Sequence, residues 1–388
     1  MSNTIEQKKF TDEDFFNFIC MRLEDFCVAM QESNIDAVIF RDSEEFRNPT
    51  VRYFSGMPSD AILAIKNDGQ TILSVWDINL AEKIPVVAGK IVPFSASRSE
   101  PVEATKDLLK KLKLKEGARV EINSNTSYPD FLEYVDGLQE YDILCRKESI
   151  HQFAVEMRSV KDEFEIACTK KAAQITNEIL DIVEDSVRSG VIKTELDAAL
   201  LIEKECRARG CERTSFETLA AGPKRSWAIH AFPSYTGEDF ATEGLSILDF
   251  GVCYEGYASD VTMTFARGNL SEKQKKMLSL VQKAADEALE YYKPGIPIRQ
   301  AALKVDKIFA KEKMKMPHSL GHGTGLEIHE EPFVRMKTPL DQVFIPGMIV
   351  TLEPGLYDAE CGGVRLENDI LITENGNEKL TNSRIVYL

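Results

Sequence analysis

The chain has 388 residues, enough for about two domains, and 43% hydrophobic with 28% charged residues is the composition of a globular protein. Its 63 acidic and 47 basic residues give a formal net charge of -16, so we expect no nucleic acid partner, because phosphate binding needs a basic surface. No run reaches about 18 uninterrupted apolar residues, and we expect no membrane span. The polar N-terminal sequence has no secretory signal pattern, so we expect a cytoplasmic protein whose eight cysteines are reduced thiols.

Residues 1–155 predict an α/β domain. Apolar side chains recur at helical spacing over 12–33, and Thr11 can cap this helix. Four strand-like runs follow, at 37–40, 61–65, 71–75 and 119–122. With a further helix at 101–113, they favour a mixed, mostly parallel, doubly wound sheet. Because no Gly-rich phosphate loop follows these strands, we expect no nucleotide site.

The second domain is predicted over 156–388, with Ser159–Asp162 in the S-x-x-D form of a helix start. One order of elements occurs twice in it: two helices, a loop and two strand-like runs, over 160–266 and again over 271–373. The repeat predicts a pseudo-twofold domain in which strands of both halves join one sheet, although this order is common enough to arise by coincidence.

Four acidic residues interrupt runs that otherwise predict buried strands. Asp249 ends one run and Asp260 lies 11 residues further on, while Glu353 and Glu367 occupy matching places in the second half. Any one of them could be an ordinary polar residue at a strand end. Four converging carboxylates, however, could not all stay ionised without cations, and two divalent ions would supply the four offsetting charges. The pattern therefore predicts a two-metal site.

Histidines add to this pattern. The chain has only five, and His318, His322 and His329 fall within 12 residues of a glycine-rich segment. Glycines would let the backbone bring imidazoles close to a metal. The alternative reading of 321–325 as a phosphate loop lacks the following Lys-Ser or Lys-Thr. His151 carries no motif and is expected at the surface.

Five motifs together resemble the pita-bread metallopeptidases, a family that includes methionine aminopeptidase, aminopeptidase P and Xaa-Pro dipeptidase (prolidase). They are LDFG, SDVTMTF, GHGTGLEIHE, LEPG and VRLEND. The resemblance implies a creatinase-like α/β N-terminal domain over 1–155 and an α+β pita-bread catalytic domain over 156–388, with the pseudo-twofold internal repeat.

The resemblance also implies a set of metal ligands. Asp249 would chelate one ion, Asp260 and Glu367 would bridge both, and His322 and Glu353 would hold the second. Such oxygen and imidazole ligands suit Mn²⁺, Co²⁺, Fe²⁺ or Zn²⁺. Mn²⁺ is the first choice from the family pattern.

The reaction implied by the resemblance is attack of a metal-bridging hydroxide on the scissile carbonyl. Glu353 would carry the proton toward the leaving nitrogen. His329 matches a family histidine that contacts the reacting amide, and His230 and His318 match two others. The alternative for His230 is a loop histidine satisfied by the backbone.

Arg365 is also expected in the site. It lies two residues before Glu367, so both side chains are expected on one face of a strand. It would either form a structural ion pair that orients Glu367 or contact the substrate, and the two roles can coexist.

The branch of the family follows from the layout. The long N-terminal region resembles aminopeptidase P, prolidase and creatinase, and creatinases lack the complete metal set. The resemblance therefore implies an Xaa-Pro peptidase acting on short peptides with proline at the second position, as dipeptidase or aminopeptidase, and a homodimer. The segment 221–230 departs from the family pattern by an extra residue, and Ala231 stands where Tyr or His is common. The alternatives are a creatinase-like hydrolase of a small non-peptide amide or amidine, and a non-catalytic binding protein.

Overall fold

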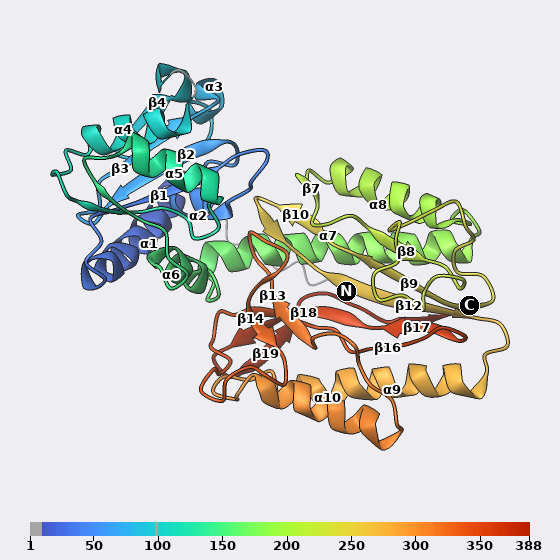
Figure 1. The fold of residues 1–388 in the computed structure, drawn as a ribbon. Helices are drawn as coiled ribbons and strands as arrows, with labels where there is room; N and C mark the ends of the chain where they lie inside the picture. Colours follow the sequence, from blue (N-terminus) through green and yellow to red (C-terminus); the bar gives the residue numbers. More distant parts are fainter. Residues whose placement is uncertain (1–9, 98–99) are drawn as a thin grey trace. The chain divides into compact units, whose positions relative to one another are not determined.

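The computed structural model describes residues 10–97 and 100–388, and the chain divides after Met157 into two compact units (Figure 1). The helices of the first unit are α1 (Asp12–Glu32), α2 (Pro49–Ser55), α3 (Ile78–Ala81), α4 (Pro101–Lys111), α5 (Tyr128–Gly137) and α6 (Ile150–Met157), with a 3₁₀ turn, η1 (Phe94–Ser97). Its strands are β1 (Ala37–Asp42), β2 (Ala61–Lys66), β3 (Thr71–Val75), β4 (Lys90–Pro93), β5 (Arg119–Glu121) and β6 (Asp142–Leu144).

The sheet of the first unit has the order β4-β3-β2-β1-β5-β6. Parallel pairings join β3 to β4, β1 to β5 and β5 to β6, whereas β1–β2 and β2–β3 are antiparallel. The predicted mixed, mostly parallel sheet is therefore present. Strands β2 and β3 form a hairpin, which is closed by the turn at Gly69, whose φ of 87° suits glycine.

Both faces of this sheet are covered because strand side chains alternate. Ile39 of β1 packs in the cluster that includes Leu108 of α4. Phe40, the next residue, lies on the other face, where its ring is 5.8 Å from those of Phe26 in α1 and Phe54 in α2.

The expectation that His151 lies at the surface is wrong. It is 4% exposed, its Nε2 lies 2.9 Å from the carbonyl oxygen of Ile39, and its Nδ1 lies 3.3 Å from the carboxylate of Glu121. Glu121 also accepts a hydrogen bond from the backbone N–H of Ile150 at 2.7 Å, at the start of α6. These partners lie in β1 and β5, far away in the sequence, so the burial of His151 could not be predicted from its neighbouring residues.

The second unit has four helices, α7 (Glu163–Arg188), α8 (Glu195–Ala208), α9 (Glu272–Leu289) and α10 (Arg299–Lys311), among the residues that are described. Its strands are β7 (Arg213–Thr214), β8 (Leu219–Ala221), β9 (Gly244–Phe250), β10 (Val252–Tyr254), β11 (Tyr257–Ala258), β12 (Val261–Arg267), β13 (Gly321–Gly323), β14 (Glu330–Val334), β15 (Ile349–Leu352), β16 (Gly355–Asp358), β17 (Gly362–Arg365), β18 (Glu367–Thr373), β19 (Gly376–Lys379) and β20 (Ile385–Tyr387).

Helix α7 begins after Asp162 rather than after Ser159. Asp162 accepts a hydrogen bond from the backbone N–H of Glu165, whose side chain accepts one from the N–H of Asp162. This reciprocal pair satisfies two of the free N–H groups at the helix end, which fixes the start three residues later than the sequence pattern indicated.

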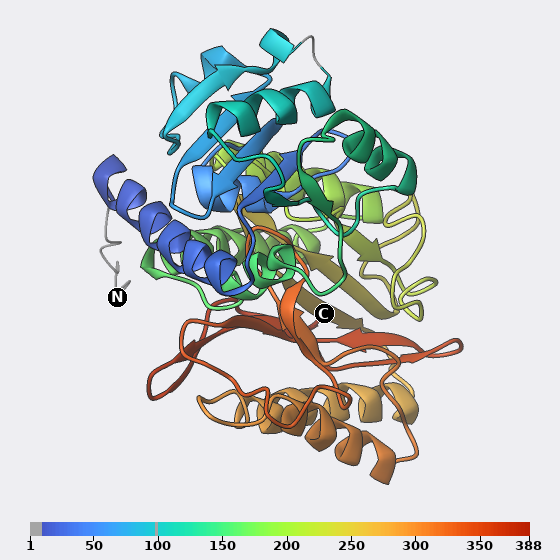
Figure 2. The same ribbon diagram turned by 60° about the vertical axis from the view of Figure 1, so that its left-hand side comes forward.

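A nine-stranded sheet organises the second unit, in the order β14-β13-β15-β18-β12-β9-β8 with β19 beside β18 and β20 beside β12. Because β18 pairs with β12, strands from 160–266 and from 271–373 share one sheet. Helices α7 and α8 pack on β9 and β12, and α9 and α10 lie along β15 and β18 (Figures 1 and 2).

Two of the predicted strands are each broken in two. The run 348–357 ends as β15 at Leu352 and resumes as β16 after Glu353 and Pro354, since proline cannot donate a ladder hydrogen bond. The run 363–373 is interrupted at Leu366 between β17 and β18. Both interruptions fall beside predicted metal ligands. Among the described residues, no helix combines the length and apolar character needed to cross a bilayer.

Candidate metal centre

Side-chain alternation directs two acids to the same face of the sheet. Val261 and Met263 of β12 pack with α7 and α8, so Thr262 between them faces the opposite side. Asp249 of β9 and Glu367 of β18 both pair with Thr262 in strand register, one from each side. The three side chains therefore form a row across neighbouring strands, on the face away from these helices.

Asp260 and Glu353 join this row from strand ends. Asp260 directly precedes β12, and Glu353 directly follows β15. The adjoining residues Val261 and Leu352 both pair with Asn368 of β18, from opposite sides. The two acids are thereby brought to the same level of the sheet.

His322 lies in β13, whose backbone is very close to the neighbouring strands β14 and β15. A Cβ atom on Gly321 would lie 1.9 Å from the carbonyl oxygen of Thr351, and one on Gly323 would lie 2.3 Å from that of Glu331. Only glycine therefore lets β13 lie between β14 and β15. The backbone N–H of His322 donates to the Thr351 hydroxyl at 3.1 Å, which fixes the strand at this point.

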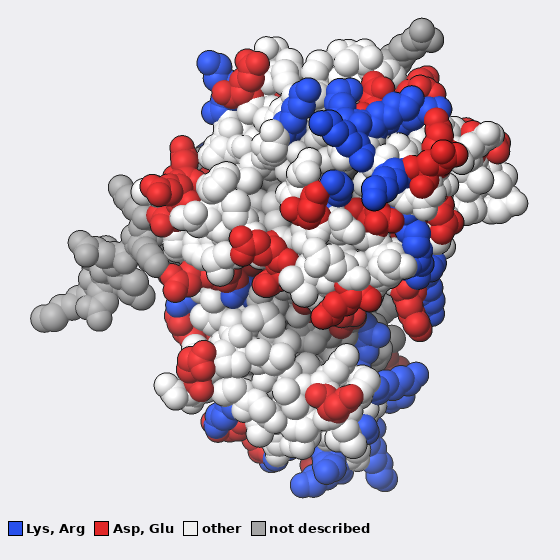
Figure 3. All heavy atoms as spheres, turned by 90° about the vertical axis from the view of Figure 1, so that its left-hand side faces the viewer, with Lys and Arg blue, Asp and Glu red and all other residues white. Residues whose placement is uncertain are grey.

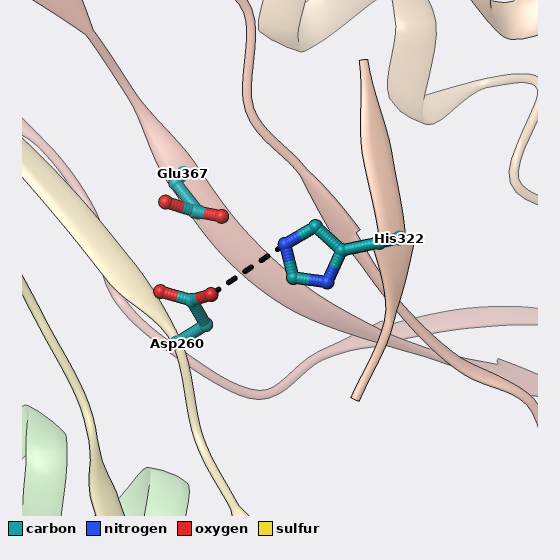
Figure 4. A group of neighbouring side chains, drawn as sticks. All are labelled: Asp260, His322 and Glu367. Carbon is teal, nitrogen blue, oxygen red and sulfur yellow. Dashed lines mark ion pairs between the residues drawn. The ribbon is translucent and has the colours of Figure 1, made fainter. Parts of the chain in front are cut away.

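Four of the predicted ligands meet at one place. Asp260, His322 and Glu367 each contribute an atom to a group that lies within 4.8 Å, and their side chains point toward one another (Figure 4). His322 Nε2 is 3.7 Å from Asp260 Oδ2 and 3.7 Å from Glu353 Oε1. Asp260, His322 and Glu367 are buried, and the Glu353 side chain is 16% exposed.

The electrostatics of the group favour bound cations. Burial, and then the charges of Glu367 and Asp249, raise the pKa of Asp260 well above its usual range. Burial, Glu353 and Asp249 do the same to the pKa of Glu367. Burial raises the pKa of Glu353 to about 8. The carboxyls cannot all be ionised here unless positive ions share the site.

The donor atoms also fit a cation. Asp249 Oδ1 and Asp260 Oδ1 are buried without a hydrogen-bond partner, which is uncommon for polar atoms in folded proteins. His322 Nδ1 lies 3.1 Å from the carbonyl oxygen of Gly323, so it serves as the N–H donor and Nε2 keeps its lone pair toward Asp260. Carboxylate oxygens with one imidazole nitrogen suit Mn²⁺, Co²⁺, Fe²⁺ and Zn²⁺ alike.

Two of the predicted catalytic histidines are exposed beside this group. The ring of His329 is centred 4.3 Å from that of His322. His230 lies in the loop between β8 and β9. Partial burial of the His329 ring, and then the charge of the neighbouring His230, lower the pKa of His329.

His318 is held more tightly. Its Nδ1 lies 2.7 Å from the carbonyl oxygen of Ser319, and its Nε2 lies 3.1 Å from the hydroxyl of Tyr357. Burial, and then the charge of Arg365, lower the pKa of His318 to about 4, so the ring is neutral near pH 7. Its Nδ1 is also 3.6 Å from Glu353 Oε2, which places it at the edge of the ligand group.

Arg365 pairs with a different acid from the one expected. Its ion pair is with Asp249, at 2.6 Å, and it reaches Glu367 only through Thr262. Arg365 Nε donates to the Thr262 hydroxyl at 3.0 Å, and that hydroxyl donates to Glu367 at 2.6 Å. Arg365 also donates to the hydroxyl of Tyr357 at 2.7 Å. The interruption between β17 and β18 separates Arg365 from Glu367, so the expected direct pair does not form.

Three residues that support the site were not anticipated: Thr262, Tyr357 and Asp369. The Asp369 carboxylate accepts the backbone N–H of Asp260 at 2.8 Å and is fully buried. Its position two residues after Glu367 on an apolar strand is the same signal that identified the other acids. The hydroxyls carried no such signal, since threonine and tyrosine are ordinary strand residues.

This arrangement, a mostly antiparallel sheet that gathers acids and an imidazole from several strands while helices cover its other face, defines a pita-bread metallopeptidase. A model of metallopeptidase family M24 matches residues 167–374, and the chain belongs to this family. It is a metallo-exopeptidase.

Relatives and solved structures match over nearly the whole chain. The Xaa-Pro dipeptidase of Pyrococcus furiosus is 31% identical to this chain, and the alignment spans 93% of this chain and 97% of the dipeptidase. The prolidase structure from Pyrococcus horikoshii OT3 superimposes with a TM-score of 0.79 at 28% identity, over 94% of this chain and 99% of that one. An X-Pro aminopeptidase structure from Thermotoga maritima MSB8 gives a TM-score of 0.77 at 25% identity, over 91% and 98%.

Proposed function

We propose that this protein hydrolyses the bond before proline in Xaa-Pro dipeptides, at a centre of two divalent metal ions. The observation that carries the proposal is the meeting of acids and an imidazole from separate strands, with two buried carboxylate oxygens that have no protein partner. Similarity to proteins named Xaa-Pro dipeptidase, over more than nine-tenths of the chain, supports the substrate class.

In this proposal Asp249 would hold one ion, Asp260 and Glu367 would hold both, and His322 and Glu353 would hold the second. Two divalent ions, when bound, supply a nucleophilic hydroxide at neutral pH and polarise the scissile carbonyl. Mn²⁺ is our first choice, with Co²⁺, Zn²⁺ and Fe²⁺ as the alternatives that the donor set also suits.

The protein's own residues position the substrate and move the proton. Glu353 can take a proton at its carboxylate and give it to the leaving proline nitrogen. His329 and His230 face solvent at the edge of the site. In this proposal they would contact the reacting amide of the dipeptide. Arg365 holds Asp249 in place. His318 lies beside Glu353 at the edge of the site, where the substrate would bind.

The wider assignment is proposed on the same grounds. Residues 1–155 are a creatinase-like domain, the catalytic halves are related by a pseudo-twofold axis, and the protein is a cytoplasmic homodimer. Acidic and basic side chains are interspersed over the face in Figure 3, and with a net charge of -16 we propose no nucleic acid partner.

The test is hydrolysis by the Mn²⁺-loaded protein of Ala-Pro, Ala-Pro-Ala, Met-Ala-Ala and creatine. Cleavage of Ala-Pro alone supports the proposal. Release of Ala from Ala-Pro-Ala makes the protein an Xaa-Pro aminopeptidase, and turnover of creatine alone makes it a hydrolase of non-peptide substrates. No turnover of any of the four, with metal bound, contradicts the proposed activity.

A further inference from the structure

A buried cluster of charges lies outside the ligand group, and its members are Arg158, Lys161 and Glu330. Arg158 donates to Glu330 Oε1 from Nη2 at 2.7 Å and from Nε at 3.2 Å, and Lys161 Nζ donates to Glu330 Oε2 at 3.1 Å. The side chains are 2%, 0% and 1% exposed, respectively. None of them belongs to the proposed metal centre.

Such a cluster is expensive to bury and is retained only if its geometry is well satisfied. Burial would raise the pKa of Glu330, but the charges of Arg158 and Lys161 lower it below its usual range, so the carboxylate is ionised. Both of its oxygens are bonded to cations, and Glu330 Oε1 also accepts the backbone N–H of Glu327 at 3.1 Å. Arg158 in turn contacts the Glu327 carboxylate.

These bonds fix the loop that carries His329. Glu330 directly follows His329, and one is buried while the other is exposed, so the two side chains point to opposite sides of the chain. Glu330 pairs in register with Gly323, next to His322. A Cβ atom on Gly325 would lie 2.5 Å from the Glu330 carboxylate, so the loop closes directly over this side chain.

The cations are anchored to rigid structure. Arg158 and Lys161 lie in the segment immediately before α7, which Asp162 caps. The backbone N–H of Lys161 donates to the carbonyl oxygen of Gly347 at 3.0 Å, in the turn that leads into β15. The anchor is therefore tied to the same strand that presents Glu353.

We propose that the ion-pair cluster of Arg158, Lys161 and Glu330 positions the His329 imidazole for the reaction, with Glu330 as the positioning residue. The inference rests on the proposed function, in which His329 contacts the substrate. The side-chain hydrogen bonds of Glu330 that the structure describes go to Arg158, Lys161 and the backbone of Glu327, none of which is a proposed metal ligand. Glu330 therefore acts by setting where the adjoining residue points.

The test is a double-mutant cycle between Glu330 and His329, read as kcat on Ala-Pro. We expect Glu330→Gln to lower kcat about 10- to 100-fold, the effect of a small misplacement of a reacting group. In a His329→Ala background the same substitution should change kcat less than about 2-fold, because the residue through which it acts is absent. If the two losses multiply instead, Glu330 has a general structural role and the proposal is wrong.

Two variants keep the cycle interpretable. Glu184→Gln is the matched control, since Glu184 is also a carboxylate bonded to two cations, Arg188 and Arg384, and it should leave kcat unchanged. Lys161→Met retains the pair of Arg158 with Glu330 and serves if Glu330→Gln does not fold. Lys161→Met should lower kcat several-fold in the protein that has His329, and it should leave kcat nearly unchanged in the His329→Ala background.

A second readout needs no turnover. In metal-free protein labelled with ¹⁵N-histidine, the His329 ring signals are those lost in His329→Ala, and Lys161→Met and Glu330→Gln should move them while leaving the His151 signals in place. Unchanged His329 signals would overturn the proposal. If the wild-type protein does not cleave Ala-Pro, the proposed function fails, while the spectra still decide whether the cluster positions His329.

Discussion

Asp369 offers the most direct test of how the proposed metal centre is held. Its carboxylate is fully buried and accepts the backbone N–H of Asp260 at 2.8 Å. Asp369→Ala would leave this N–H without an acceptor, in a place that water does not reach. Asp369→Asn is the matched control, because its side-chain oxygen can still accept the same hydrogen bond.

The expected cost follows from that one contact. A buried donor left unsatisfied costs about 1–3 kcal/mol, and for a unit of this size each kcal/mol lowers the melting temperature by about 2–4 °C. Because the freed backbone lets the Asp260 carboxylate move, the affinity for metal should also fall, by about 10- to 100-fold. Asp369→Asn should retain most of the wild-type stability and most of the affinity for metal.

The measurements are urea unfolding of the metal-free proteins and competition for Mn²⁺ or Zn²⁺ against a fluorescent chelator. Asp369→Ala should unfold at lower urea and bind metal more weakly than Asp369→Asn. Wild-type affinity and stability in Asp369→Ala would refute the view that this hydrogen bond positions Asp260. Equal losses in the two variants would instead assign the effect to the negative charge.

Three further predictions concern the ligands, the ions and the first unit. Asp260→Asn should lose bound metal and turnover together, whereas His329→Ala should keep its metal, measured by atomic emission, and lose about 10²- to 10⁴-fold in kcat. Chelation of the metal should abolish turnover and lower the melting temperature measured by calorimetry. If the free metal was at about 100 times its Kd, the loss of unfolding free energy should be about 2.7 kcal/mol. Re-addition of Mn²⁺ should restore both turnover and stability. In the first unit, burial opposes ionisation of Glu121, but the hydrogen bonds that it accepts lower its pKa below 4.5. Its stabilising effect is therefore complete above pH 4.5 and is lost as the pH falls through the lowered pKa. The unfolding free energy of the first unit, measured by the fluorescence of Trp76 in a Trp227→Phe protein, should therefore fall in acid. It should fall less when Glu121→Gln is added to that protein.

The sequence alone was sufficient to single out the acidic residues that the fold brings together, because they violate the pattern around them. Asp249, Asp260, Glu353 and Glu367 stand in or beside runs that would otherwise be buried and apolar, where an isolated carboxylate is costly. A conflict of this kind is visible without coordinates. The strands of the first unit and the helices of the second could also be predicted from the sequence, because residue periodicity and helix caps are local signals.

What only the tertiary structure decided is which distant groups meet. Arg365 pairs with Asp249 across 116 residues, and Arg158 with Glu330 across 172. His151 is buried because its partner oxygen on Ile39 lies 112 residues away. Such pairs depend on strand register and on where a strand breaks, because a shift of a single residue sends the side chains of a strand to the opposite face. No local pattern carries that information, because the partners become neighbours only when the chain is folded.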